Sequence, residues 1–116
     1  MRVPGGFKNL GGMMKQAQKQ MRDLQHKMRE VEDDLRDRVV EGSAGGGMVR
    51  VMFNGLQEPL DVKIDEQVLQ EESPEFLQEM ILAAMRQGLK KAKELEETER
   101  EKVSGSLNIP GLDGLI

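Results

Sequence analysis

Cationic side chains recur on one side of a helical pattern in the first third of the chain. Lys15, Lys19 and Arg22 follow one another at steps of four and three, a spacing that keeps them on one face of an α-helix. No acid interrupts this face. From position 15 to position 29 it extends about 21 Å at helical rise, the length of roughly six base pairs. Such a row could bind the phosphates of a polyanion by electrostatic attraction. The full row comprises Lys8, Lys15, Lys19, Arg22, His26 and Arg29.

A second basic set occurs late in the chain, where Arg86, Lys90 and Lys93 share one helical face. The charge is strongly polarised along the sequence. Residues 1–29 carry a net charge of +6 and residues 30–116 a net charge of −10, within a total of −4. Attraction acts over a Debye length of about 8–10 Å, so local charge matters more than the total. A solvated helix face is the alternative explanation of each basic set.

No pattern of catalytic or cofactor-binding residues accompanies these cations. His26 is the only histidine and there is no cysteine, which excludes the usual zinc sites and thiolate chemistry. The glycine-rich residues 42–47 lack the Lys-Ser/Thr of a phosphate-binding loop. We therefore expect no enzyme activity, no catalytic residue, no metal, no cofactor and no small-molecule substrate. No stretch approaches about 20 apolar residues, so we also expect no membrane span.

The helix that must carry the first basic row has an apolar seam on its other side. Leu, Met, Ala and Val recur at alternating steps of four and three, the a and d positions of a heptad. Two interpretations stay open: packing within the chain, or pairing with a second chain, which the helix length favours. The seam consists of Leu10, Met14, Ala17, Met21, Leu24, Met28, Val31 and Leu35.

From about residue 39 the hydrophobic period changes to two, which predicts strands. We expect strands over 39–41, 49–53 and 60–64, with a glycine-rich connection at 42–47 and a two-residue hairpin at Asn54-Gly55. Asp65 is expected to cap one helical turn. Ser73-Pro74 then predicts the start of a second long helix, which we expect to end near residue 102.

The predicted fold class is therefore α+β, in the order α-β-β-β-α, with a three-stranded antiparallel sheet and two long projecting helices. Residues 1–9 are expected to form a flexible arm, residues 10–102 the domain, and residues 103–116 a flexible tail. Because only three aromatic residues are available for a core, a single copy would be marginally stable. Association into a homodimer is the expected remedy.

In order and spacing, several short motifs of this chain resemble those of the YbaB/EbfC nucleoid-associated proteins of bacteria. No single motif is specific, but together they cover nearly the whole chain. The motifs are Phe-Lys-Asn-Leu at 7–10, Met-Lys-Gln-Ala-Gln at 14–18, Gly-Gly-Gly-Met-Val-Arg-Val at 45–51, Asn-Gly at 54–55, Val-Lys-Ile-Asp at 62–65, Ala-Ala at 83–84, Lys-Ala at 91–92 and Pro-Gly-Leu at 110–112.

This resemblance implies a cytoplasmic, nucleoid-located homodimer that binds double-stranded DNA with low sequence preference through its projecting helices. Because no aromatic residue is interleaved with the cations, duplex phosphate is a better target than unpaired bases. The alternative is a coiled-coil adaptor or chaperone-like module that grips another protein with the Met-rich seam. The expected DNA-binding residues are Lys15, Lys19, Arg22 and Arg29, with Arg86, Lys90 and Lys93 as secondary contacts.

Overall fold

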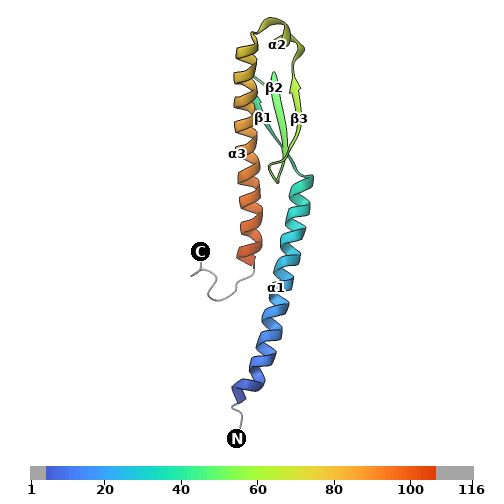
Figure 1. The fold of residues 1–116 in the computed structure, drawn as a ribbon, viewed down its shortest axis with the longest axis vertical. Coiled ribbons are helices and arrows are strands. Elements are labelled where there is room, and N and C mark those ends of the chain that lie inside the picture. Colours follow the sequence, from blue (N-terminus) through green and yellow to red (C-terminus); the bar gives the residue numbers. More distant parts are fainter. Residues whose placement is uncertain (1–4, 107–116) are drawn as a thin grey trace.

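A computed structural model describes the backbone of residues 5–106 and the side chains of residues 10–105. It contains two long helices and a sheet in an elongated arrangement of 88 × 24 × 19 Å (Figure 1). Its radius of gyration, 23.2 Å, greatly exceeds the roughly 13 Å of a compact chain of similar length. The elongation arises because one helix extends away from the rest of the molecule.

The element order confirms the predicted α+β class, with one additional short helix at the predicted capped turn. Helix α1 spans Gly5–Asp37 and helix α3 spans Pro74–Ser106. Residues 5–9 and 103–106, which the sequence assigned to an arm and a tail, are thus helical, because each long helix continues past the predicted domain boundary. Residues 1–4 and 107–116 lie outside the described residues. The remaining elements are β1 (Val39–Ala44), β2 (Val49–Asn54), β3 (Pro59–Ile64) and α2 (Glu66–Glu71).

The three strands form an antiparallel sheet in the order β1-β2-β3. Helix α3 packs against one face of β1 and β2. Val49, Val51 and Phe53 of β2 point toward α3 and form the centre of the core, together with Met80, Ala84 and Ala92 of that helix. Strand β3 stays outside this cover, and all its residues except Ile64 are exposed.

Strand β1 is longer than predicted, because Gly42, Ser43 and Ala44 belong to the strand and not to a glycine-rich connection. Gly42 is buried beneath α3, next to Ala84 and Gly88. The close contact between strand and helix needs a residue without a side chain, so this glycine serves packing. The actual connection is Gly45-Gly46-Gly47-Met48, whose three glycines all have positive φ, a conformation that glycine adopts without strain.

The predicted two-residue hairpin at Asn54-Gly55 is wrong. The loop comprises residues 55–58, between the end of β2 and the start of β3, and the residue with positive φ is Gln57, at 65°. Asn54 is buried, and its Oδ1 accepts hydrogen bonds from the backbone N–H groups of Leu56 and Glu58, both at 3.0 Å. The side chain therefore organises a wider loop, as asparagine does in turns of this kind.

The predicted starts of α2 and α3 are confirmed. The Asp65 carboxylate accepts a hydrogen bond from the Gln67 N–H at 3.0 Å and caps α2. The Ser73 hydroxyl accepts one from the Phe76 N–H at 3.2 Å at the start of α3. Pro59 is the first residue of β3, where its missing N–H costs no hydrogen bond within the strand.

Candidate nucleic-acid interface

Helix α1 carries the first set of predicted contacts on its exposed outer side. We call Lys15, Lys19, Arg22 and Arg29 the arm set. All four side chains are exposed, and none forms an ion pair with another described residue. In Figure 1 this part of α1 extends away from the sheet. The arm set is therefore open to solvent and to an incoming anion along its whole length.

Most cations nearer the sheet are engaged in contacts within the chain. Arg50, for example, lies 3.6 Å from the Glu41 carboxylate, and the Lys91 ammonium donates a hydrogen bond to the Glu41 carbonyl at 2.9 Å. Lys27 and Lys63, by contrast, have no carboxylate partner among the described residues. The cations within ion-pair distance of carboxylates are Arg36, Arg38, Arg50, Arg100 and Lys102.

Helix α3 carries the second set, Arg86, Lys90 and Lys93, which we call the α3 set. Ala84 and Ala92 on the same helix are buried against the sheet. The α3 set lies on the opposite side of the helix, and all three of its residues are exposed. Across residues 10–105 no carboxylate pairs with any of its three members. The fold therefore leaves this set free as well.

The structure does not bring the two sets together within one chain. Helices α1 and α3 meet where Arg38 approaches Glu99 at 3.2 Å. From this junction Arg29 lies about 14 Å along α1 and Lys93 about 9 Å along α3, at 1.5 Å per residue. The helices continue in opposite directions from there (Figure 1). The path along the two helices between the nearest members of the two sets, Arg29 and Lys93, is thus about 23 Å.

Exposed carboxylates occupy the space between the two sets. On α1 the charge changes sign after Arg29, and on α3 it changes after Lys93. Only some of these acids are neutralised, such as Asp33 by Arg36 at 3.1 Å. We call this region the acidic zone. It consists of Glu30, Glu32, Asp33, Asp34, Asp37, Glu94, Glu97 and Glu101, all of them exposed.

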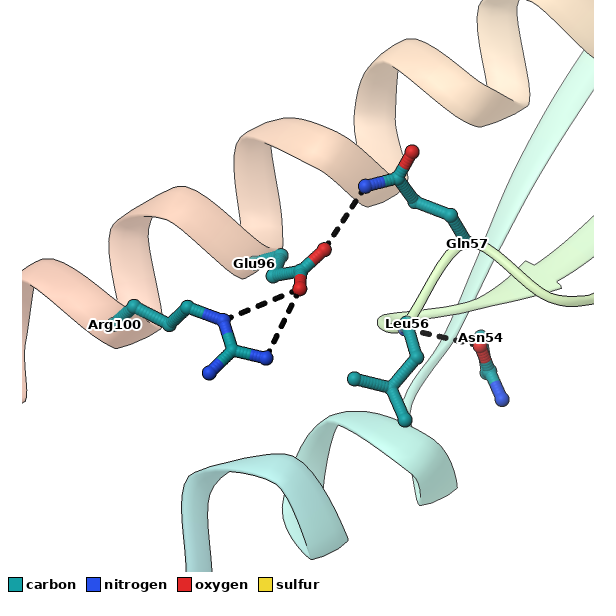
Figure 2. A network of polar contacts seen from close by, with 5 residues as sticks. All are labelled: Asn54, Leu56, Gln57, Glu96 and Arg100. Carbon is teal, nitrogen blue, oxygen red and sulfur yellow. Dashed lines mark hydrogen bonds and ion pairs between the residues drawn. The ribbon is translucent and has the colours of Figure 1, made fainter. Parts of the chain in front are cut away.

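The sequence analysis does not predict the polar network at the junction. Gln57 of the β2–β3 loop donates a hydrogen bond to Glu96 at 2.9 Å, and Arg100 donates to the same carboxylate at 3.0 Å (Figure 2). The spacing of Glu96 and Arg100 indicates a helical pair. Nothing local links Gln57 to a residue 39 positions away, so the fold alone reveals that contact.

Polar contacts at the junction lower the pKa of two carboxyl groups, those of Glu96 and Glu99. The hydrogen bond from Gln57 is the main cause that holds the pKa of Glu96 below its ordinary value, with Arg100 adding to it against partial burial. The hydrogen bond from Lys102 is the main cause that lowers the pKa of Glu99, with a further contribution from Arg38. Both carboxylates stay ionised at neutral pH and tie α3 to the loop and to α1.

The described residues offer little that resembles a catalytic or ligand-binding pocket. His26 is exposed and lies 2.9 Å from Glu30. The open depression beside Ala17, Met21 and Gln25 is formed by one helix surface, which cannot enclose a small molecule. Across the described residues, no group of three potential ligands could hold a metal ion. None of the helices in this part of the chain is apolar over a membrane-spanning length.

The fold is that of an α+β protein with two long helices and a three-stranded sheet. Its projecting helix α1 carries unpaired cations that could bind a polyanion. The chain belongs to the YbaB/EbfC DNA-binding family, whose model matches residues 7–107. This confirms the resemblance predicted from the short motifs and makes the chain a member of a family of nucleoid-associated, DNA-binding proteins.

Individual relatives agree with this assignment. The chain is 50% identical over 93 residues to a nucleoid-associated protein of Syntrophobacter fumaroxidans, covering 80% of this chain and 84% of the relative. It is 39% identical over 109 residues to one of Thermoanaerobacter pseudethanolicus, covering 94% of both. The crystal structure of an uncharacterized protein from Helicobacter pylori has a TM-score of 0.55 at 28% identity, covering 73% of this chain and 94% of that one.

Proposed function

We propose that the protein binds double-stranded DNA with low sequence preference, as a homodimer in the cytoplasm and nucleoid, and that the arm set makes the main phosphate contacts. The observation that carries the proposal is the absence of carboxylate partners for Lys15, Lys19, Arg22 and Arg29 among the described residues. Free cations on a projecting helix can replace the counterions of a duplex, and the released counterions drive association.

Low sequence preference follows from the chemistry of the arm set. Contacts between cations and phosphates position a protein on DNA but carry no sequence information. Stacking on unpaired bases would need exposed aromatic residues beside the cations. Among the side chains of residues 10–105 there are two phenylalanines, and neither lies beside the arm set: Phe53 is buried in the core and Phe76 lies at the start of α3. Duplex phosphate is therefore the target that fits the exposed part of α1.

Strand β3 is the surface that we assign to the homodimer. Val62 lies opposite Val51 in the sheet, yet Val62 is 49% exposed and Val51 only 1%, because α3 does not reach over β3. Leu60 is exposed on the same strand. A second copy placed over this strand would bury the remaining apolar part of the sheet face.

The two edges of the sheet support the same choice. The β1 edge is closed by α3, since Gln87 accepts a hydrogen bond from the Ser43 N–H at 2.7 Å and Lys91 donates to the Glu41 carbonyl. The β3 edge has no comparable cover among the described residues. An open antiparallel edge can pair with an identical strand through a two-fold axis. Dimerisation through β3 leaves both arms free for DNA.

Fluorescence anisotropy with a labelled duplex of about 30 base pairs tests the DNA-binding proposal. If a dimer engages about six phosphates, log affinity falls with log salt concentration at a slope near −5. Lys19→Glu/Arg22→Glu abolishes binding while circular dichroism shows an intact fold. Gln70→Glu/Thr98→Glu, which adds negative charge at exposed positions that belong to neither basic set, is the control and retains binding. Unchanged affinity in the first variant overturns the proposal.

A second candidate function rests on the apolar seam of α1. Leu35 is buried, whereas Met14 and Met21 are 58% and 56% exposed, so the outer part of the seam lacks a partner in the described chain. A methionine-rich surface suits varied protein partners, as expected of an adaptor or chaperone-like module. Salt separates the two candidates: apolar binding holds or strengthens at high salt, whereas DNA binding weakens.

A further inference from the structure

We propose that the α3 set binds a second duplex, so that the protein bridges two segments of double-stranded DNA. This inference rests on the proposed DNA binding by the arm set and adds a second site with a separate role. Arg86, Lys90 and Lys93 would contact the phosphates of the second segment.

The distance between the sets is the first argument. Arg38 and Glu99 join the two helices, and the sets extend from that junction in opposite directions. The path along the two helices is about 23 Å from Arg29 to Lys93 and about 54 Å from Lys15 to Arg86, at 1.5 Å per residue. A duplex that crosses the arm transversely therefore does not reach the α3 set of the same chain.

The acidic zone is the second argument. A single duplex could reach both sets only by running along the molecule, past the exposed carboxylates of the zone. Glu94 and Glu97 on α3 and Asp37 on α1 are exposed and have no ion-pair partner among residues 10–105. Phosphates within the Debye length of about 8–10 Å would be repelled there. Charge thus favours two separate duplexes over one continuous path.

The freedom of the α3 set is the third argument. Lys91, which lies between Lys90 and Lys93 in the sequence, is not free, because its ammonium donates a hydrogen bond to the Glu41 carbonyl and helps to cover the β1 edge. Arg86, Lys90 and Lys93 have no such contact with the described chain. They span about 10.5 Å of helix, the length of about three phosphates on one strand. The set is therefore the size of a compact phosphate site.

A bridging assay tests the inference. A biotinylated duplex in excess is fixed to streptavidin beads, and capture of a second, fluorescent duplex is measured with and without the full-length protein. Anisotropy with a single duplex is measured in parallel. Each phosphate contact contributes about eightfold to affinity at 0.1 M salt. Arg86→Gln/Lys90→Gln therefore weakens the second site by about 60-fold and abolishes capture, while single-duplex binding stays at the wild-type level.

The control is Gln70→Glu/Thr98→Glu, which lowers the net charge by the same two units and captures normally. Capture by Arg86→Gln/Lys90→Gln at the wild-type level overturns the inference, because bridging would then come from the two arms of a dimer. An equal loss of single-duplex affinity in that variant also overturns it, since both sets would then contact one duplex. If the wild-type protein binds one duplex but captures no second one, the bridging inference is overturned while the proposed DNA binding stands. Absence of any duplex binding overturns the proposed function as well.

Discussion

Gly42→Ala tests the close packing of β1 against α3 on which the core depends. A methyl group at this position would lie 1.9 Å from the Ala84 carbonyl oxygen, 2.4 Å from the Gly88 nitrogen and 2.8 Å from the Gly88 Cα. All three atoms belong to the backbone and cannot turn aside. Carbon–oxygen contacts settle at about 3.3 Å or more, so α3 must retreat from the sheet by more than about 1 Å.

The cost of this retreat can be estimated from the contacts it breaks. A gap of 0.5–1 Å already forfeits a quarter to a half of each dispersion contact, and Val49, Val51 and Phe53 all pack against α3. We expect a loss of about 3 kcal/mol in the free energy of unfolding, at the upper end of overpacking effects. With urea m-values of about 1–3 kcal/mol/M, the unfolding midpoint falls by about 1–3 M.

Urea titration followed by circular dichroism measures this shift. The matched control is Gly12→Ala in α1, where a methyl group would meet nothing within 4 Å. The control raises stability by up to about 1 kcal/mol through helix propensity. Both variants are compared at one protein concentration, because self-association alters apparent stability. A Gly42→Ala midpoint equal to that of the wild type would refute the packing argument.

Three further predictions concern the loop, the junction and the dimer. Asn54→Ala leaves two loop N–H groups without their acceptor at a site only 2% exposed, and should lower the free energy of unfolding by about 1–3 kcal/mol; an unfolding midpoint equal to that of the wild type in the same urea titration would contradict this role. The hydrogen bond from Gln57 is the main cause that lowers the pKa of Glu96 in the folded protein, so the Glu96 carboxylate contributes fully to the free energy of unfolding above its ordinary pKa of 4.5 and loses this contribution as the pH falls through the lower folded pKa. Glu96→Gln should therefore flatten the pH dependence of the urea unfolding midpoint in that pH range. A pH profile equal to that of the wild type would contradict this role of Glu96. Val62→Asp places a charge on the open face of β3 and should convert the proposed dimer to a folded monomer in light scattering; a mass equal to that of the wild type would exclude this interface.

Local patterns in the sequence were sufficient for most of the secondary structure. The heptad spacing fixed the long first helix, and the period-two alternation of Val49, Val51 and Phe53 fixed the central strand and its buried face. Ser73 was recognised as a cap because its hydroxyl needs only a neighbour three residues away. These features depend on contacts between residues a few positions apart, and such contacts can be predicted from the spacing of residue types in the sequence.

Where the prediction failed, the deciding contacts came from distant parts of the chain. Because glycine is common in loops, the sequence pattern predicts a loop at Gly42. Its actual role is to let β1 pack closely against Ala84 and Gly88 of α3, more than forty residues later in the chain. Asn54-Gly55 suggested a tight turn, but Gly55 lies against Leu35 of α1 and donates its N–H to the Leu35 carbonyl at 2.7 Å. Gly55 thus contacts α1, and the connection between β2 and β3 is a four-residue loop instead of a two-residue turn.

For the candidate nucleic-acid interface, too, local spacing predicts some features and long-range packing decides others. Helical periodicity assigns every side chain a direction, so the residue order alone shows which cations share a helix face. The tertiary fold sets which cations are free, since Arg38, just after α1, finds its partner Glu99 on α3. It also decided that the arm set and the α3 set lie on opposite sides of an acidic zone. Their separation depends on how α1 leaves the sheet, and that direction is set by packing between residues far apart in the chain.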